Sequence, residues 1–100
     1  MTNFEYKKQI QRCISQLDET YLDVFKKVEH LLRVDISSKK KRLKILLYFS
    51  EFLATHMLNN HSLDTMFPNG IDKFYSDLIT NTNLNGVEKQ KKIVYGIVTL

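Results

Sequence analysis

Residues 37–58 read SSKKKRLKILLYFSEFLATHML, and this stretch decides the fold. Five of the six positions from Lys39 to Lys44 are cationic, and the fourteen residues that follow are mostly apolar. A helix that is apolar on most sides packs against more than one neighbour. The stretch therefore predicts a buried helix over residues 39–58 with a positively charged start, capped by Ser37 or Ser38. The cationic first turn opposes the helix macrodipole, which costs roughly a few tenths of a kcal/mol per exposed charge and must be offset by burial.

Two helices are predicted before this stretch. Thr2 followed by Glu5 fits a capping box, and apolar residues at helical spacing then predict a first helix over residues 3–15. A second helix follows, in which apolar residues keep a three-and-four spacing over four turns, with Ser15 or Asp18 available as its N-cap. The apolar residues of this second helix are Leu17, Tyr21, Val24, Phe25, Val28, Leu31 and Leu32.

The second half of the chain predicts two more helices. Residues 63–67 form a short apolar turn, and Pro68-Asn69-Gly70 is a strong helix breaker. A fourth helix is predicted over residues 71–80, and a fifth from about residue 86, for which the β-branched residues leave a strand as the alternative. With only 3 glycines and 1 proline, a many-stranded fold is disfavoured. Residues 1–100 are thus predicted to form a single all-α domain of four to five helices in antiparallel hairpins.

The helices pair into two similar units, which suggests a repeat. The sequence LDVF at residues 22–25 resembles IDKF at residues 71–74, 49 positions later. The basic cluster from Lys39 to Lys44 has a counterpart in the lysines of residues 89–92, about 50 positions later. Solenoids of helical hairpins have this form, with periods of about 40–47 residues. Chance similarity between two amphipathic hairpins is the alternative.

The pattern resembles HEAT-type helical repeats, and the order of elements is most similar to the start of a condensin HEAT subunit. The segments that carry the resemblance are YKKQIQRCISQL, DVFKKVEHLL, RLKILLYFSEFLATH, IDKFYSDLI and KQKKIVYGIV. The resemblance implies a HEAT- or ARM-like scaffold, associated with chromosomes, that binds a protein partner. The middle-domain helical repeats of translation and cap-binding factors have a similar spacing, which would imply an RNA-associated scaffold instead.

The basic clusters form the candidate nucleic-acid site. The chain has a net charge of +4 and a pI of about 9.2, which favours nucleic acid, acidic proteins or anionic lipid as partners. If the two units stack in parallel, both clusters would line one edge and contact phosphates without reading bases. A solubilising rim or a nuclear-targeting run is the alternative. The candidate nucleic-acid-binding residues are Lys39, Lys40, Lys41, Arg42, Lys44, Lys89, Lys91 and Lys92.

The last residues of the chain are apolar and lack a Gly or Asn C-cap. This pattern favours either a partner surface or the first units of a longer solenoid. The candidate partner-binding residues are Tyr95, Ile97, Val98 and Leu100. A second functional hypothesis is a free-standing helical bundle that binds and neutralises another protein, as immunity or inhibitor proteins do.

The sequence predicts no catalytic, metal or cofactor site and no small-molecule substrate. His56 and His61 are five residues apart with Asp64 nearby, but a helix end and a loop give no convergent ligand geometry. Cys13 is expected to be a buried, inert thiol. The N-terminus lacks the apolar core of a secretory signal, and the longest apolar run, residues 45–49, is too short to span a membrane. We therefore expect an intracellular protein that is not an enzyme, for which the nucleus is one option if the source is a eukaryote.

Overall fold

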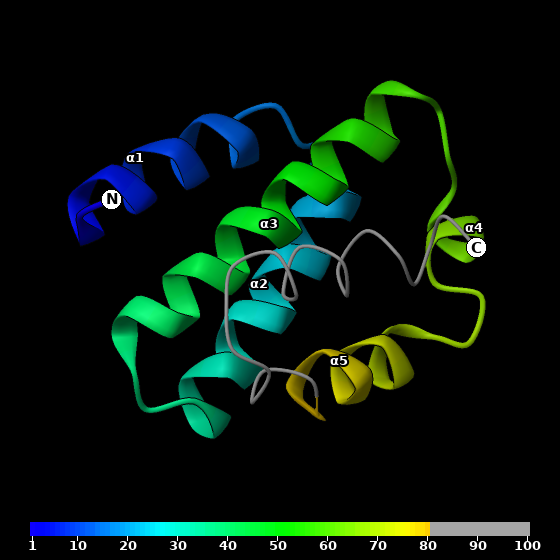
Figure 1. Cartoon of the computed structure of the whole chain (residues 1–100). Coiled ribbons are helices and arrows are strands. Elements are labelled where there is room, and N and C mark those ends of the chain that lie inside the picture. The colour runs from blue at the N-terminus through cyan, green and yellow to red at the C-terminus, as the bar shows by residue number, and fades with distance from the viewer. Residues whose placement is uncertain (81–100) are drawn as a thin grey trace.

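The computed structural model describes residues 1–80, and all regular structure in this part of the chain is helical (Figure 1). This confirms the predicted all-α class. The predicted fifth helix, its strand alternative and the candidate partner residues Tyr95, Ile97, Val98 and Leu100 lie outside the described residues. The helices are α1 (Asn3–Ile14), α2 (Glu19–Asp35), α3 (Lys39–Leu58), α4 (Leu63–Met66) and α5 (Ile71–Thr80).

The central element is α3, which lies between α1 on one side and α2 on the other (Figure 1). The helix has the predicted bounds, and nine of its residues are buried on nearly all sides of its axis. Its start is exposed at Lys39 and Lys40. Ser38 is the N-cap, and its hydroxyl accepts the Lys41 backbone N–H at 3.3 Å. The structure thus confirms a buried helix with a cationic start.

The predicted capping signals also define α1 and α2. The Thr2 N–H donates to the Glu5 carboxylate at 3.0 Å, and the Glu5 N–H donates to the Thr2 hydroxyl at 3.2 Å. The hydrogen bond from the Thr2 N–H lowers the pKa of Glu5. Asp18 caps α2 by accepting the Tyr21 N–H at 3.1 Å, whereas the Ser15 hydroxyl donates back to a carbonyl of α1. Ser15 therefore follows α1 as its C-cap, and α1 is one residue shorter than expected.

Four phenylalanines attach the segment after α3 to the core. Phe49 and Phe52 of α3 meet Phe67, which follows α4, and Phe74 of α5, with ring centroids 5.0–6.4 Å apart. Each ring is 6% exposed or less. The turn between Phe67 and Phe74 uses Gly70, whose φ of +86° is a conformation that glycine adopts without strain.

Polar contacts also join α5 to α2. The Tyr75 hydroxyl donates to the Asp35 carboxylate at 2.6 Å, next to the C-terminal end of α2. Burial and the hydrogen bond to Asp35 raise the pKa of Tyr75. In the first turn of α5, the Asp72 carboxylate lies 3.3 Å from Lys27 Nζ, in an exposed ion pair. Hence α5 is fixed both by the aromatic rings on α3 and by side chains of α2.

Candidate anion-binding site

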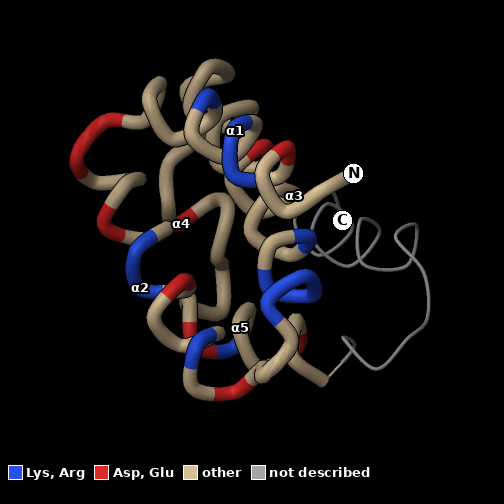
Figure 2. Tube along the Cα trace, turned by 90° about the vertical axis from the view of Figure 1, so that its left-hand side faces the viewer, with Lys and Arg blue, Asp and Glu red and all other residues tan. Residues whose placement is uncertain are grey.

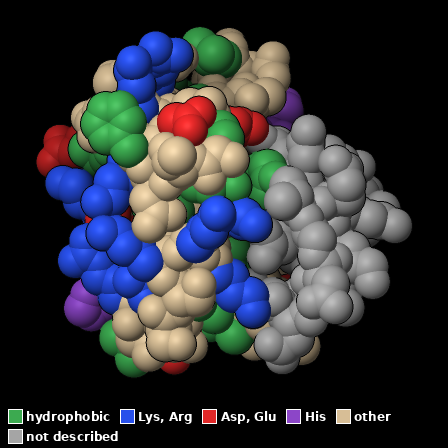
Figure 3. Space-filling view, turned by 60° about the vertical axis from the view of Figure 1, so that its left-hand side comes forward, with side chains coloured by type: hydrophobic (Ala, Val, Ile, Leu, Met, Phe, Trp, Pro, Cys, Tyr) green, Lys and Arg blue, Asp and Glu red, His purple; other side chains and the backbone are tan. Residues whose placement is uncertain are grey.

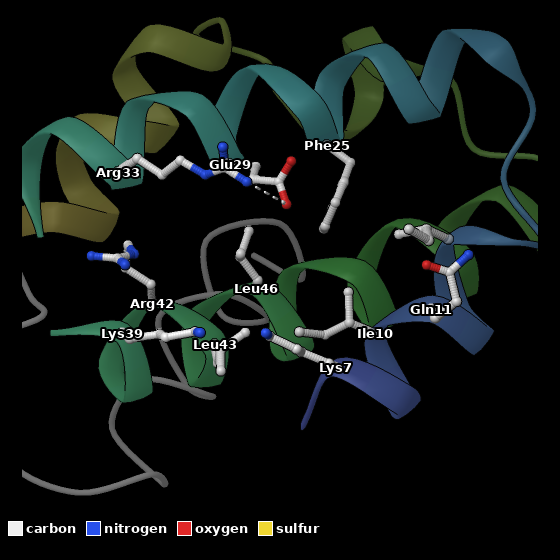
Figure 4. Close-up of a pocket in the computed structure, with 11 residues that line it drawn as sticks. Lys7, Ile10, Gln11, Phe25, Glu29, Arg33, Lys39, Arg42, Leu43 and Leu46 are labelled. Atoms are coloured by element: carbon white, nitrogen blue, oxygen red, sulfur yellow. Dashed lines mark ion pairs between the residues drawn. The ribbon is translucent and has the colours of Figure 1, made fainter. Parts of the chain in front are cut away.

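A groove of about 540 Å³ opens between α1, α2 and α3 (Figure 4). Its volume falls within the roughly 300–1,000 Å³ that small-molecule sites occupy. All three helices contribute side chains to it. The lining residues are Lys7, Ile10, Gln11, Ile14, Phe25, Glu29, Arg33, Lys39, Arg42, Leu43 and Leu46.

The floor of the groove is the apolar core itself. Ile10 comes from α1, Phe25 from α2, and Leu43 and Leu46 from α3. Each of these side chains is 8% exposed or less, because each also packs into the core shared by the three helices. The floor is therefore rigidly placed, but it offers little apolar surface to a ligand.

The rim of the groove is cationic. Lys7 of α1, Arg33 of α2, and Lys39 and Arg42 of α3 line it. Among the described residues, Glu29 is the single carboxylate of the lining, and its Oε2 lies 4.0 Å from Arg33 Nη2. Four cations against one carboxylate leave an excess of three positive charges, which favours anionic ligands.

Lys7 and Lys39 are neighbouring cations of the rim. Their side chains come from different helices and point toward one another beside Leu43 (Figure 4). The proximity of Lys7 lowers the pKa of Lys39, because two neighbouring ammonium groups repel each other. An anion placed between them would remove this repulsion, because each ammonium would then face an opposite charge.

Arg42 lines the groove and also makes hydrogen bonds to the backbone. Its Nη1 donates to the Ile36 carbonyl at 2.5 Å and to the Ser37 carbonyl at 3.0 Å. These carbonyls belong to the connection between α2 and α3, where the end of a helix leaves acceptors without intrahelical partners. The guanidinium therefore holds this connection in place.

The surface around the groove is basic. Figure 2 shows the run of basic positions at the start of α3. Figure 3 shows one face of the molecule, on which Lys and Arg side chains are more common than Asp and Glu. An anion approaching this side of the protein would meet a positive potential.

The structure brings together part of the predicted cluster and adds to it. Lys39 and Arg42 line the groove, whereas Lys40, Lys41 and Lys44 lie on α3 outside the lining. The other candidates, Lys89, Lys91 and Lys92, lie outside the described residues. Sequence reasoning missed two cations of the rim. These are Lys7 and Arg33.

A signal for Lys7 exists in the sequence. Lys7 precedes Ile10 by three residues and Ile14 by seven, so that it borders the apolar face of α1. However, the position of α1 relative to the start of α3 depends on tertiary packing, which this spacing does not specify.

One expectation about the histidines is wrong. His56 and His61 do converge, with their Nδ1 atoms 2.6 Å apart and their ring centroids separated by 4.9 Å. The reason is the turn after α3, where Asn60 adopts a left-handed φ of 59° and the His61 N–H donates to the His56 carbonyl at 2.9 Å. Within residues 1–80, no three His, Cys, Asp or Glu side chains are grouped to hold a metal, so Asp64 does not complete a site.

The histidine pair predicts a loss of stability in mild acid. Burial and the neighbouring charge of His61 lower the pKa of His56 below its ordinary value of 6.5. The unfolded chain then binds the proton more readily, so the free energy of unfolding should fall as the pH drops from 6.5 toward the folded-state pKa. Urea midpoints at pH 7.5 and 5.5 measure this change. We expect the free energy of unfolding to decrease less between these pH values in His56→Asn than in the wild type. In the exposed control His30→Asn it should decrease as much as in the wild type. Equal decreases in all three proteins would contradict this role of His56.

Cys13 differs slightly from the expectation. The side chain is partly exposed rather than fully buried, although it lies on the same face of α1 as Tyr6 and Ile10. Burial still raises the pKa of its thiol. The structure therefore gives Cys13 no activated thiolate.

The chain was compared with known protein families, curated proteins and solved structures, and none of them matched it. In the part of the chain that the structure describes, no helix is both long and apolar enough to cross a membrane.

Proposed function

We propose that this protein is a non-catalytic scaffold that binds nucleic acid through phosphate contacts at the groove. One observation carries the proposal: cations from three different helices converge on one groove. Among the described residues, a single carboxylate lines the same groove. Phosphate groups are the anions that nucleic acids present along their whole length, and Lys and Arg are their usual protein partners. Because these contacts go to the backbone, binding would be largely independent of sequence.

The small apolar surface supports phosphates over an acidic protein as the ligand. A stable protein interface buries about 800 Å² on each partner around an apolar centre. The floor of the groove is almost fully buried. Within residues 1–80, the most exposed large apolar residues are Phe4, Val34 and Leu58, and none of them lines the groove.

The proposal extends to the predicted repeat. The three residues that connect α2 to α3 are short enough for a helical hairpin, which supports a HEAT-like scaffold. In such a scaffold, the cluster of Lys89, Lys91 and Lys92 would extend the basic edge beyond the groove. Together with the resemblance to condensin HEAT subunits or to the middle domains of translation factors, such an edge favours a chromosome-associated or an RNA-associated role inside the cell.

Charge reversal at the groove tests the proposal. At about 50 mM salt, Lys7→Glu/Lys39→Glu should bind a duplex of about 20 base pairs, and the matching single strand, about tenfold more weakly than the wild type. Fluorescence anisotropy of labelled DNA and RNA gives the affinities. For about three to four phosphate contacts, the slope of log K against log salt for the duplex should be about −3, and it should become shallower by about 1–2 in the variant.

The matched control is Lys8→Glu/Lys26→Glu. It makes the same change in net charge at exposed residues of α1 and α2 that do not line the groove. We expect it to keep most of the affinity, and circular dichroism would show that both variants fold. Absence of binding by the wild type at low salt, or equal losses in the two variants, would overturn the proposal.

A further inference from the structure

The pair Lys7 and Lys39 at the rim of the groove carries more positive charge than one backbone phosphate can balance. Lys7 and Lys39 face each other at the rim, and their proximity lowers the pKa of Lys39. Glu29, the carboxylate of the described lining, lies beside Arg33 rather than between the two lysines (Figure 4). A phosphodiester brings a single negative charge to this pair, whereas a phosphate monoester carries about −1.5 to −2 at pH 7.

The N-terminal end of α3 adds to the positive potential beside these two lysines. Lys39 is the first residue of this helix of 20 residues, and the start of a helix has a partial positive charge from its aligned peptide dipoles. The two lysines and the helix start therefore act together on an anion at one end of the groove. This combination favours the more highly charged of two phosphate species.

The rest of the groove suits an organic group attached to that phosphate. From the two lysines, the groove continues over Leu43, Leu46 and Ile10 toward Gln11 and Glu29 (Figure 4). The small exposed part of the apolar floor can contact the edge of a base or the carbon skeleton of a sugar. The Gln11 amide and the Glu29 carboxylate can accept hydrogen bonds from hydroxyl or amino groups.

We propose that the groove binds a terminal phosphate monoester on a nucleoside, with the phosphate between Lys7 and Lys39. Such a group occurs at the 5′ end of a nucleic-acid strand and on a free nucleotide. The first source rests on the proposed function, and it adds that the protein prefers strand ends to internal phosphates.

Two oligonucleotides that differ only at the 5′ end test the preference. We expect an oligonucleotide with a 5′-phosphate to bind about fivefold more tightly than the same sequence with a 5′-hydroxyl, the effect of about one extra charge at contact distance in water-like surroundings. In Lys7→Gln/Lys39→Gln this difference should disappear. Adenosine 5′-monophosphate, titrated directly by calorimetry with adenosine as its control, tests the free nucleotide.

The outcomes separate this inference from the proposed function. Equal binding of the two oligonucleotides, with no binding of the monophosphate, would overturn the preference for a monoester and leave backbone binding intact. Binding of the monophosphate by the wild type but not by Lys7→Gln/Lys39→Gln, with no binding of either oligonucleotide, would support the free nucleotide as ligand and overturn the proposed function. If none of the three ligands binds, both proposals are wrong.

Discussion

Phe49→Ala is expected to lower the free energy of unfolding by about 3–5 kcal/mol, the cost of truncating a fully buried phenylalanine. Phe49 is 0% exposed, and its ring lies 5.7–6.4 Å from the rings of Phe52, Phe67 and Phe74. These rings come from α3, from the residue after α4, and from α5. The cavity would therefore open where α3 meets the segment that follows it, and neighbouring rings already in contact can fill it only in part.

Chemical denaturation of the wild type and of two variants measures this effect. The matched control is Phe4→Ala, because Phe4 is 73% exposed and surface substitutions usually change stability by about 0.5 kcal/mol or less. The total free energy of unfolding of small domains is about 5–15 kcal/mol. If the wild type lies at the lower end of this range, Phe49→Ala should be partly unfolded at the growth temperature of the source organism. Similar losses in both variants would show that Phe49 is not central to the core.

Tyr75→Phe is expected to cost about 1.5–3 kcal/mol, the range for hydrogen bonds to charged groups. The substitution keeps the ring, which is buried, and removes only the hydroxyl that donates to Asp35 at 2.6 Å. The loss should also depend on pH in the wild type. Because burial and Asp35 raise the pKa of Tyr75 above its ordinary value of 10, the stabilisation is complete below pH 10 and is lost as the pH rises further.

Urea denaturation at pH 7.5 and 10.5 distinguishes this interaction from simple packing. Tyr6→Phe is the control, since Tyr6 is also buried but its hydroxyl has no hydrogen-bond partner among the described residues. We expect Tyr6→Phe to keep the stability of the wild type within about 0.5 kcal/mol, and the gap between wild type and Tyr75→Phe to narrow at pH 10.5. A gap that does not change with pH would contradict the role given to the hydroxyl.

The helices themselves could be predicted well, because their signals are local. The capping box at Thr2, the caps at Asp18 and Ser38, and the breaker at residues 68–70 all act within a few residues of the chain. These signals specified the bounds of α1, α3 and α5 to within one residue, whereas they left the N-cap of α2 open between Ser15 and Asp18. The buried character of α3 was equally accessible, since apolar residues cover most of its circumference.

The composition of the groove was only half predictable, because it depends on how helices pack. The cluster at the start of α3 gave Lys39 and Arg42, but Lys7 and Arg33 reach the same groove only after α1 and α2 have packed on α3. The histidine pair was missed for a related reason. The turn that brings His61 back to His56 contains Asn60 in a left-handed conformation. The spacing of apolar residues in a helix does not predict such a turn.

The residues of the basic cluster differ in which substitutions they can tolerate, because Arg42 also holds two backbone carbonyls. Lys40 is exposed, and a lysine there could be exchanged for any polar residue while the helices keep their positions. Both hydrogen bonds come from the Nη1 of Arg42. A lysine at residue 42 would preserve the charge, but its Nζ lies one bond closer to the backbone and would not reach the Ile36 and Ser37 carbonyls in the same geometry. Substitutions of the lysines can therefore change how strongly this surface attracts anions. Substitutions of Arg42 would also disturb the connection between α2 and α3.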